Sequence, residues 1–479
     1  MMRSKSLSIL LPLVALFAWG GTALGQLRGA HTDQLRRDLR KIDPTRHIRF
    51  FSSLQSRYTG YPGCEEAEDY VRERYKELGL AAIRREPFQI IVPVDKGATL
   101  TVTGKAVEDV SGSTEVKLFG LRPNYARAPK TPKNGLNGPL IWGGNGRLED
   151  FNGKEVKGSI VLMRFNTGTR WLNAAKLGAR AVVFIEPPHT FRTNAEQKFT
   201  TLPLPTPRYY LQHSELPTLA SELGELQETP SEDEALEILR RLGTDREGRG
   251  EIRADMRWEE STVYTVSGEI PGTDPELTEE TLVCHAYYDS TSVVPALSPG
   301  AESSCGISAQ LEIARFLRRH PPRRTVRFLA TPGHFQALAG VRDYAFRKIY
   351  AKRLRKTGDE QIARSGEPSF FIGLDLSSRH KSMAGFYKGH FYDQYGNQQE
   401  IKLQRIYADY STELLDWAGE IVGPARMIED VKFESGIVPK HGRDWRSLLP
   451  DNVAFDSEVI SIHGRPAITA HQGTIGIRL

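Results

Sequence analysis

Hydrophobic and polar positions along this chain follow two periods, one typical of helices and one typical of strands. In the first hundred residues, apolar side chains recur at helical spacing over residues 33–58 and again over residues 65–78, where Gly79 ends the pattern. Residues 88–94 and 99–102 alternate or run apolar, which predicts two strands. The chain therefore begins with two helices followed by two strands.

The middle of the chain, residues 112–250, has many Pro and Gly connections around a strand–helix–strand unit. The elements predicted here are strands at 159–164 and 181–185, helices at 171–177 and 232–242, and a closing charged run at 245–257. The second strand is an unbroken apolar run, as in buried parallel strands. This part is predicted to be an insertion with its own core.

From residue 263 onward, strand and helix patterns alternate. Strands are predicted at 263–270, 281–285, 325–330 and 370–376, and helices at 307–317, 337–350 and 411–421. Such alternation predicts an α/β fold, with a mostly parallel sheet covered by helices on both faces. Ligand sites of these folds lie at the C-terminal ends of the strands, so the segments that follow the strands are the candidates for chemistry.

The N-terminus has the pattern of a signal peptide. Arg3 and Lys5 precede an apolar run at 7–19, and small residues follow at 23–25. The run is shorter than the roughly 20 residues that span a bilayer. We therefore expect residues 1–25 to be removed and the mature protein to be exported, periplasmic or extracellular, with no membrane span. An uncleaved segment that anchors the chain is the alternative.

Composition limits the remaining classes. A chain of 479 residues predicts two or three compact units. The net charge of +5 includes Arg3 and Lys5, so the mature chain carries 5 − 2 = +3, spread over mixed acidic and basic runs; this argues against nucleic acid as a partner. Cys64, Cys284 and Cys305 form no metal-binding spacing. A Cys284–Cys305 bridge and two buried free thiols both remain open.

Two segments of the middle part read VKGSIVL at 156–162 and AAKLGARAVV at 174–183. Together they resemble the protease-associated domain, which is an insertion in exported peptidases. The resemblance implies that residues 112–250 are such an insertion in a peptidase-like domain made of residues 26–111 and 251–479.

Five further segments follow one another along the chain, each at or after the end of a predicted strand. They are VSGEIPGT at 266–273, HAYYDS at 285–290, PGAESSCG at 299–306, TPGHFQALAG at 331–340 and GLDLSS at 373–378. They resemble the motifs of the zinc exopeptidase family that includes bacterial leucyl aminopeptidase, glutamate carboxypeptidase and transferrin receptor. In active members, His and carboxylate ligands hold two zinc ions, and a Glu takes a proton from the metal-held water. The family fold usually finishes with a helix that would lie beyond residue 479, in a longer parent chain or a partner.

The resemblance implies that several functional positions of the family are replaced. Tyr287 stands where a zinc-binding His belongs, His334 stands where the general-base Glu belongs, and Phe335 stands at a metal-ligand position. A phenyl ring cannot bind zinc. Asp289 keeps the position that orients the lost His. A di-zinc reaction of the family type is therefore not expected.

Other candidate metal ligands either match a ligand position of the family or lie near one. Asp375 matches a family ligand, and Glu302 replaces the bridging Asp, although a carboxylate at a helix N-terminus explains it equally well. His285 faces the same side of its strand as the lost ligand position. His471 or His463 could be the late His ligand of the family, although a lone His near a strand end is more often only hydrogen-bonded.

Two main hypotheses follow from these replacements. The first is a non-catalytic relative without a cofactor, whose former catalytic cleft is lined by Tyr287, Tyr288 and Phe335 and binds a peptide or protein. The second is an active metallo-exopeptidase with one zinc ion. Its ligands would come from the set His285, Glu302, His334, Asp375 and His471.

A third hypothesis is a serine or cysteine hydrolase that uses Ser290 or Cys305 with His334. It has little support, because the sequence contains no nucleophile elbow.

Overall fold

The computed structural model describes residues 37–38, 41–103, 114–124, 126–190, 192–198, 204–224, 228–244, 247–350, 368–377, 382–386, 432–435 and 454–471. The predicted signal peptide and the helix predicted at 411–421 lie outside these residues. Contacts divide the chain into two compact units. Unit 1 comprises Met1–Ile90, Thr262–Ser290 and Pro299–Leu479, and unit 2 comprises Ile91–Ser261 and Thr291–Ser298.

The sheet of unit 1 is mostly parallel. Its strands are part of β7 (Arg249–Ile270), β8 (Thr281–Tyr287), β9 (Thr325–Thr331), β10 (Phe370–Asp375), β11 (Ser382–Phe386), β12 (Lys432–Ser435) and β13 (Ala467–His471), in the order β7-β9-β8-β10-β13-β11-β12. Neighbours pair in parallel except β7 with β9 and β11 with β13. The predicted α/β class is confirmed.

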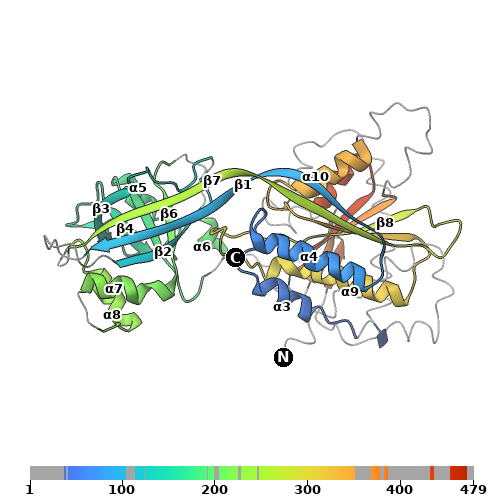
Figure 1. Ribbon diagram of the computed structural model, residues 1–479, viewed down its shortest axis with the longest axis horizontal. Coiled ribbons are helices and arrows are strands. Elements are labelled where there is room, and N and C mark those ends of the chain that lie inside the picture. Colours follow the sequence, from blue (N-terminus) through green and yellow to red (C-terminus); the bar gives the residue numbers. More distant parts are fainter. Residues whose placement is uncertain are drawn as a thin grey trace. The chain divides into compact units, whose positions relative to one another are not determined.

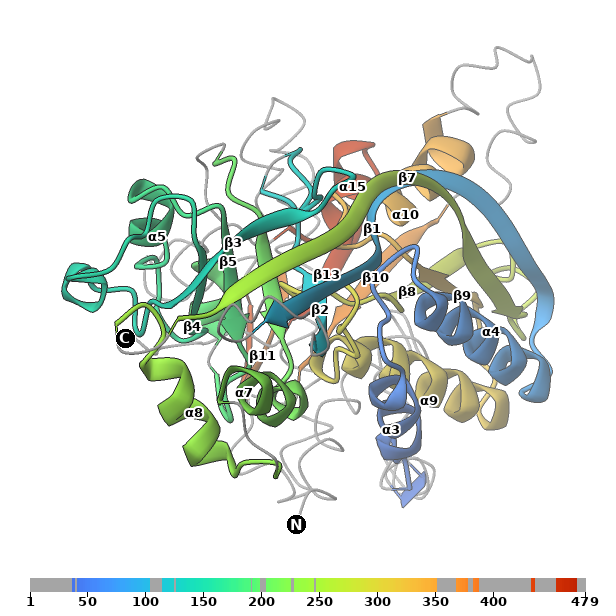
Figure 2. The ribbon, with the colours of Figure 1, turned by 60° about the vertical axis from the view of Figure 1, so that its left-hand side comes forward.

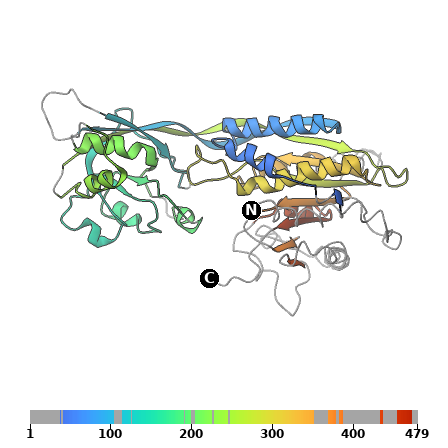
Figure 3. The ribbon, with the colours of Figure 1, turned by 90° about the horizontal axis from the view of Figure 1, so that it is seen from below.

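Helices cover both faces of this sheet. One face carries α3 (Thr45–Ser53), α4 (Pro62–Glu77) and α9 (Cys305–Arg319), and the other carries α10 (Ala339–Ala345) and α15 (Asp456–Ile462). Figure 1 shows α4 beside α9, and Figure 3 shows the pair on one side of the strands. Strand side chains alternate between the two cores, so Leu282 and Cys284 pack toward α9 while Val283 packs toward α10 and α15.

Two predicted strands, 88–94 and 99–102, are one continuous strand, β1 (Ala81–Thr103). The charged run at 245–257, for which the sequence pattern predicts no strand, belongs to β7 in its described part from residue 249 onward. In that segment Ile252 and Met256 are buried while Arg253 and Arg257 are exposed. A strand with one solvent-exposed face can carry charged residues at every second position. For this reason the strand is hard to recognise in a charged segment of sequence.

Two predicted helices are shorter than expected. The first, predicted over residues 33–58 with an interruption at Pro44, contains α3, which begins directly after that proline at Thr45 and ends at Ser53, before the predicted end. The helix predicted at 337–350 starts at Ala339 and continues as a π-helix, Phe346–Tyr350. Ala337 and Leu338 have φ of 55° and 58°, a left-handed conformation that an α-helix excludes.

Unit 2 has a mixed sheet in the order β1-β2-β6-β5-β4-β3-β7. Its further elements are strands β2 (Thr114–Gly120), β3 (Leu136–Trp142), β4 (Ile160–Arg164), β5 (Ala181–Ile185) and β6 (Arg208–Leu211), with helices α5 (Leu172–Lys176), α6 (Arg192–Glu196), α7 (Leu216–Gly224) and α8 (Glu232–Arg240) and short 3-10 turns at Leu148–Phe151 and His213–Glu215. Strands β3 to β6 are parallel, and α7 packs beside α8 (Figure 2). The predicted strand–helix–strand unit is β4-α5-β5, and the predicted insertion, residues 112–250, lies within unit 2.

The structure also describes the state of the three cysteines and the length and polarity of the helices. Cys64, Cys284 and Cys305 are all free thiols, so the Cys284–Cys305 bridge does not form and the free-thiol alternative holds. Among the helices of the described residues, none has both the length and the apolar character needed to cross a bilayer.

Candidate functional site

The parallel strands of unit 1 end at one edge of the sheet, and polar side chains collect there on the face covered by α15. These side chains are His285 and Tyr287 of β8, Thr331 of β9, His334 in the loop after β9, Asp375 of β10, His471 of β13 and Asp456 of α15. The strand register aligns Asp375 with His471 and Tyr287 with Thr331. The fold thus gathers residues from four distant segments of the chain.

The carboxylate of Asp375 is hydrogen-bonded to two side chains. The hydroxyl of Tyr287 donates to Asp375 Oδ1 at 2.7 Å, and His471 Nδ1 lies 2.8 Å from Asp375 Oδ2. Burial raises the pKa of Asp375, but the charge and hydrogen bond of His471 outweigh it, and the pKa lies well below its usual range. Both oxygens of this carboxylate are therefore occupied by other side chains.

His334 forms a buried ion pair with Asp456. Its Nδ1 lies 2.7 Å from Asp456 Oδ2, and its ring stacks on Tyr287 with ring centroids 4.0 Å apart. Burial by itself would lower the pKa of His334. The negative charges of Asp456, Asp375 and Asp289 outweigh burial and raise this pKa to about 9. At neutral pH the ring is consequently an imidazolium that faces three carboxylates.

His285 lies deeper in the same cluster. Its Nε2 is 2.8 Å from the hydroxyl of Thr331, its ring stacks on Phe371, and its Nδ1 is 4.0 Å from Asp456 Oδ2. Burial lowers its pKa to about 4, so the ring is neutral. The sequence correctly predicted that His285 faces the same side of β8 as Tyr287, but its Nε2 contacts Thr331.

Asp289 is fully buried at the end of β8. The hydroxyl of Thr59 lies 2.9 Å from both Asp289 Oδ2 and Gln336 Oε1. A hydroxyl has one proton, and the amide nitrogen of Gln336 is otherwise buried without a partner, so an amide turned by 180° that donates to Thr59 satisfies all three groups. Burial raises the pKa of Asp289 to about 6. Asp289 thus organises the loop at Thr59 and Gln336.

The other predicted positions have different surroundings. Phe335 packs edge-on against Tyr287 and His334, with ring centroids 5.5 and 4.8 Å apart, so it adds apolar surface to the polar cluster. Glu302 lies in the 3-10 helix Glu302–Ser304, at the entrance to α9. His463 Nδ1 is bonded to the carbonyl oxygen of Val459, one turn back in α15.

Two further expectations about the site need correction. Tyr288 does not line a cleft, because it is 1% exposed and its hydroxyl donates to the backbone oxygen of Tyr264. Tyr287 is 6% exposed and belongs to the internal network. Cys305 is not an activated nucleophile, since burial and the charge of Glu302 raise its pKa to about 12.

The donors present do not fit a two-zinc centre of the family type. Tyr287 and Phe335 stand among the polar side chains without offering a zinc ligand of the usual kind, and the oxygens of Asp375 are bonded to Tyr287 and His471. In the part of the chain that the structure describes, no group of three or more His, Cys, Asp or Glu is placed to hold a metal ion. The Nδ1 atoms of His334 and His471 instead contact the carboxylates of Asp456 and Asp375.

Some residues of the site were missed in the sequence. Asp456 is not among the residues that the sequence singled out, yet it is the partner of His334. Arg57 is fully buried and donates to the backbone oxygens of Tyr288 and Pro299. It joins the end of β8 to the segment before α9. Neither role has a local signal, because each depends on pairing across more than a hundred residues.

No protein-family model matches this chain, and no curated protein matches it. Solved structures do match over most of their length. A peptidase M28 precursor from Shewanella amazonensis SB2B is 14% identical over 92% of this chain and 87% of its own, with a TM-score of 0.49. A zinc aminopeptidase from Bacillus subtilis is 17% identical over 91% and 87%, with a TM-score of 0.47. An aminopeptidase from Aneurinibacillus sp. strain AM-1 is 16% identical over 92% and 87%, with a TM-score of 0.40. At these values the likeness carries no conclusion about activity, which must come from the side chains of the site.

Tyr287→Phe removes one hydroxyl and tests its bond to Asp375. Hydrogen bonds to charged groups contribute about 1.5–3 kcal/mol, against about 0.5–1.5 kcal/mol for neutral ones. We expect this variant to lower the free energy of unfolding by the larger amount. The adjacent Tyr288→Phe variant, which loses a bond to a neutral carbonyl, is the matched control. Urea unfolding of both variants measures the difference, and equal losses would contradict an ionised Asp375.

Proposed function

We propose that this chain is an exported, non-catalytic relative of the zinc aminopeptidases that acts by binding a peptide or protein. The observation that carries the proposal is the ion pair of His334 with Asp456 at the position of the family's general base. A general base must have a free lone pair at the working pH. With a pKa of about 9, His334 is already protonated at neutral pH and cannot take a proton from water.

The neighbouring histidine does not replace it. His285 is neutral, but it is 1% exposed and its Nε2 is bonded to Thr331, so a substrate-bound water has no access to it. The occupied oxygens of Asp375 also oppose the one-zinc alternative, because Tyr287 and His471 would have to leave before a metal could bind. Binding remains as the activity that needs none of these groups.

The partner class rests on the family resemblance and on the predicted signal peptide and protease-associated insertion. All three are typical of proteins that meet peptides or other proteins outside the cytoplasm. Because Tyr287 and Tyr288 are buried and Phe335 is half-buried, the former cleft offers little of the aromatic surface that the sequence suggested. A partner therefore has to use other surfaces of the chain.

The test is the metal content and peptidase activity of the purified mature chain. We expect less than about a tenth of an equivalent of zinc after dialysis against micromolar zinc, since several correct donors are needed for tight binding. We also expect no chelator-sensitive hydrolysis of leucine p-nitroanilide. The triple variant Tyr287→His, His334→Glu, Phe335→Glu restores three family positions and is the control, with a higher zinc content expected. About one equivalent of zinc with chelator-sensitive activity in the natural chain would refute the proposal.

A further inference from the structure

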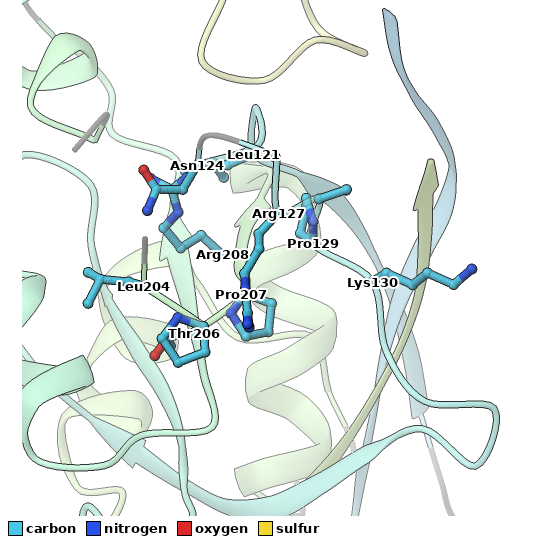
Figure 4. A pocket seen from close by; sticks show the side chains of 11 residues that line it. Leu121, Asn124, Arg127, Pro129, Lys130, Leu204, Thr206, Pro207 and Arg208 are labelled. Carbon is cyan, nitrogen blue, oxygen red and sulfur yellow. The ribbon is translucent and has the colours of Figure 1, made fainter. Parts of the chain in front are cut away.

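Unit 2 contains a small cavity that is separate from the strand-end site. Its volume is about 210 Å³, and its walls are the segment after β2 and the segment that leads into β6. Figure 4 shows Arg208 between Asn124 and Arg127. Pro129, Pro205 and Pro207 form part of the wall, and proline restricts the backbone there. The cavity is consequently a largely preformed place for a small group.

The described lining carries positive charge and no acidic residue. Arg208 is 4% exposed, and its two terminal nitrogens donate to the backbone oxygens of Lys198 and Arg122. Arg127 is exposed on the other side of the cavity. No ion pair between described residues includes Arg127 or Arg208. A buried guanidinium without a carboxylate is costly, and an anion in the cavity would relieve that cost.

Two lysines, Lys198 and Lys130, lie near the two arginines of the cavity. Burial, and after it the charges of Arg208 and Arg170, lower the pKa of Lys198 to about 7, and Lys198 Nζ bonds to the backbone oxygens of Gly168 and Asn194. Lys130 also lines the cavity, but its Nζ is 3.3 Å from Asp255 and its side chain points away from the other labelled groups (Figure 4). The free positive charge of the cavity is therefore that of the two arginines.

We propose that this cavity binds the carboxylate of one acidic or C-terminal residue of a peptide, between Arg127 and Arg208. Planar guanidinium groups bind carboxylates through paired hydrogen bonds, and lysine does not offer this geometry. The volume equals that of about seven waters, which accommodates one residue. The hydroxyl of Thr206 and the amide of Asn124 provide neutral hydrogen-bonding groups beside it. The choice of a peptide rests on the proposed binding function, whereas the anion site does not.

The experiment measures binding of the N-acetylated pentapeptide Gly-Gly-Ala-Leu-Glu to the full mature chain by isothermal titration calorimetry, so that no charged dye is attached to the peptide. We expect saturable binding that weakens with added salt. Arg127→Gln should weaken it about tenfold, the loss of one charge-assisted hydrogen bond. Arg127 is exposed, so this variant should fold. Lys133→Gln, an exposed cation of the same segment that does not line the cavity, should change binding by no more than about twofold.

The peptide arms identify the group that is bound. A C-terminally amidated peptide with Gln in place of Glu should not bind, while peptides that keep either carboxylate should. Equal binding of the neutral peptide, or unchanged binding by Arg127→Gln, would overturn the site. If inorganic phosphate competes as well as the peptide does, the cavity is a simple anion site and the peptide assignment is wrong. None of these outcomes depends on zinc content or peptidase activity, so the two proposals can fail separately.

Discussion

Replacement of His334 by alanine should lower the free energy of unfolding by about 3–5 kcal/mol, the range for breaking a buried ion pair from one side. The loss is large because Asp456 would keep its charge, and it is 4% exposed with Oδ1 already lacking a hydrogen-bond partner. Asp375 and Asp289 would lose the same nearby cation. Urea-dependent hydrogen exchange of peptides that cover β8 and β10 measures this loss in unit 1.

Two variants separate charge from packing. His334→Phe keeps an aromatic ring against Tyr287 but removes the positive charge, so we expect it to cost nearly as much as alanine. His189→Ala removes an exposed histidine and should change stability by less than about 0.5 kcal/mol. If His334→Phe proved as stable as the natural chain, His334 would be a packing residue and not the cation of the network.

The same ion pair predicts a loss of stability in mild alkali. The pKa of His334 is about 9 in the folded chain and 6.5 in its ordinary state. A group with a raised pKa stabilises the fold fully below its unfolded pKa, and this stabilisation disappears as the pH rises from 6.5 through 9. The difference corresponds to about 3 kcal/mol. We expect exchange in β8 and β10 to accelerate accordingly once its intrinsic pH dependence is removed.

Other groups must be kept apart from this effect. The pKa of Asp289 is raised to about 6, so this carboxyl lowers the stability of the fold as the pH rises from about 4 to about 6. This change is complete below the alkaline window. Lys198 in unit 2 has a lowered pKa of about 7, so its effect has the opposite sign, with stability rising between 7 and 10.5. The difference between the natural chain and His334→Phe isolates the histidine. A difference that stays constant from pH 6.5 to 9 would contradict the raised pKa.

Most of the fold could be predicted because its signals are local. Apolar runs such as Ala181–Ile185 and the amphipathic helix Cys305–Arg319 keep their character in the structure. The long strands β1 and β7 were missed or divided, because exposed charged faces interrupt their apolar pattern. The start of α10 was also misplaced, since the positive φ of Ala337 and Leu338 has no sequence signal in residues that normally favour helices.

The sequence by itself determined which donors positions 287 and 335 can offer. A phenyl ring at position 335 and a phenol at 287 cannot do what a Glu and a His do, whatever their surroundings. Only the tertiary structure decided what the remaining groups do instead. Charge states depend on burial and on neighbours in space, and Asp456 reaches His334 across 122 positions of the chain. Thus the identity of the side chains could be read from the residues, whereas their assembly into an internal ion-pair network needed the fold.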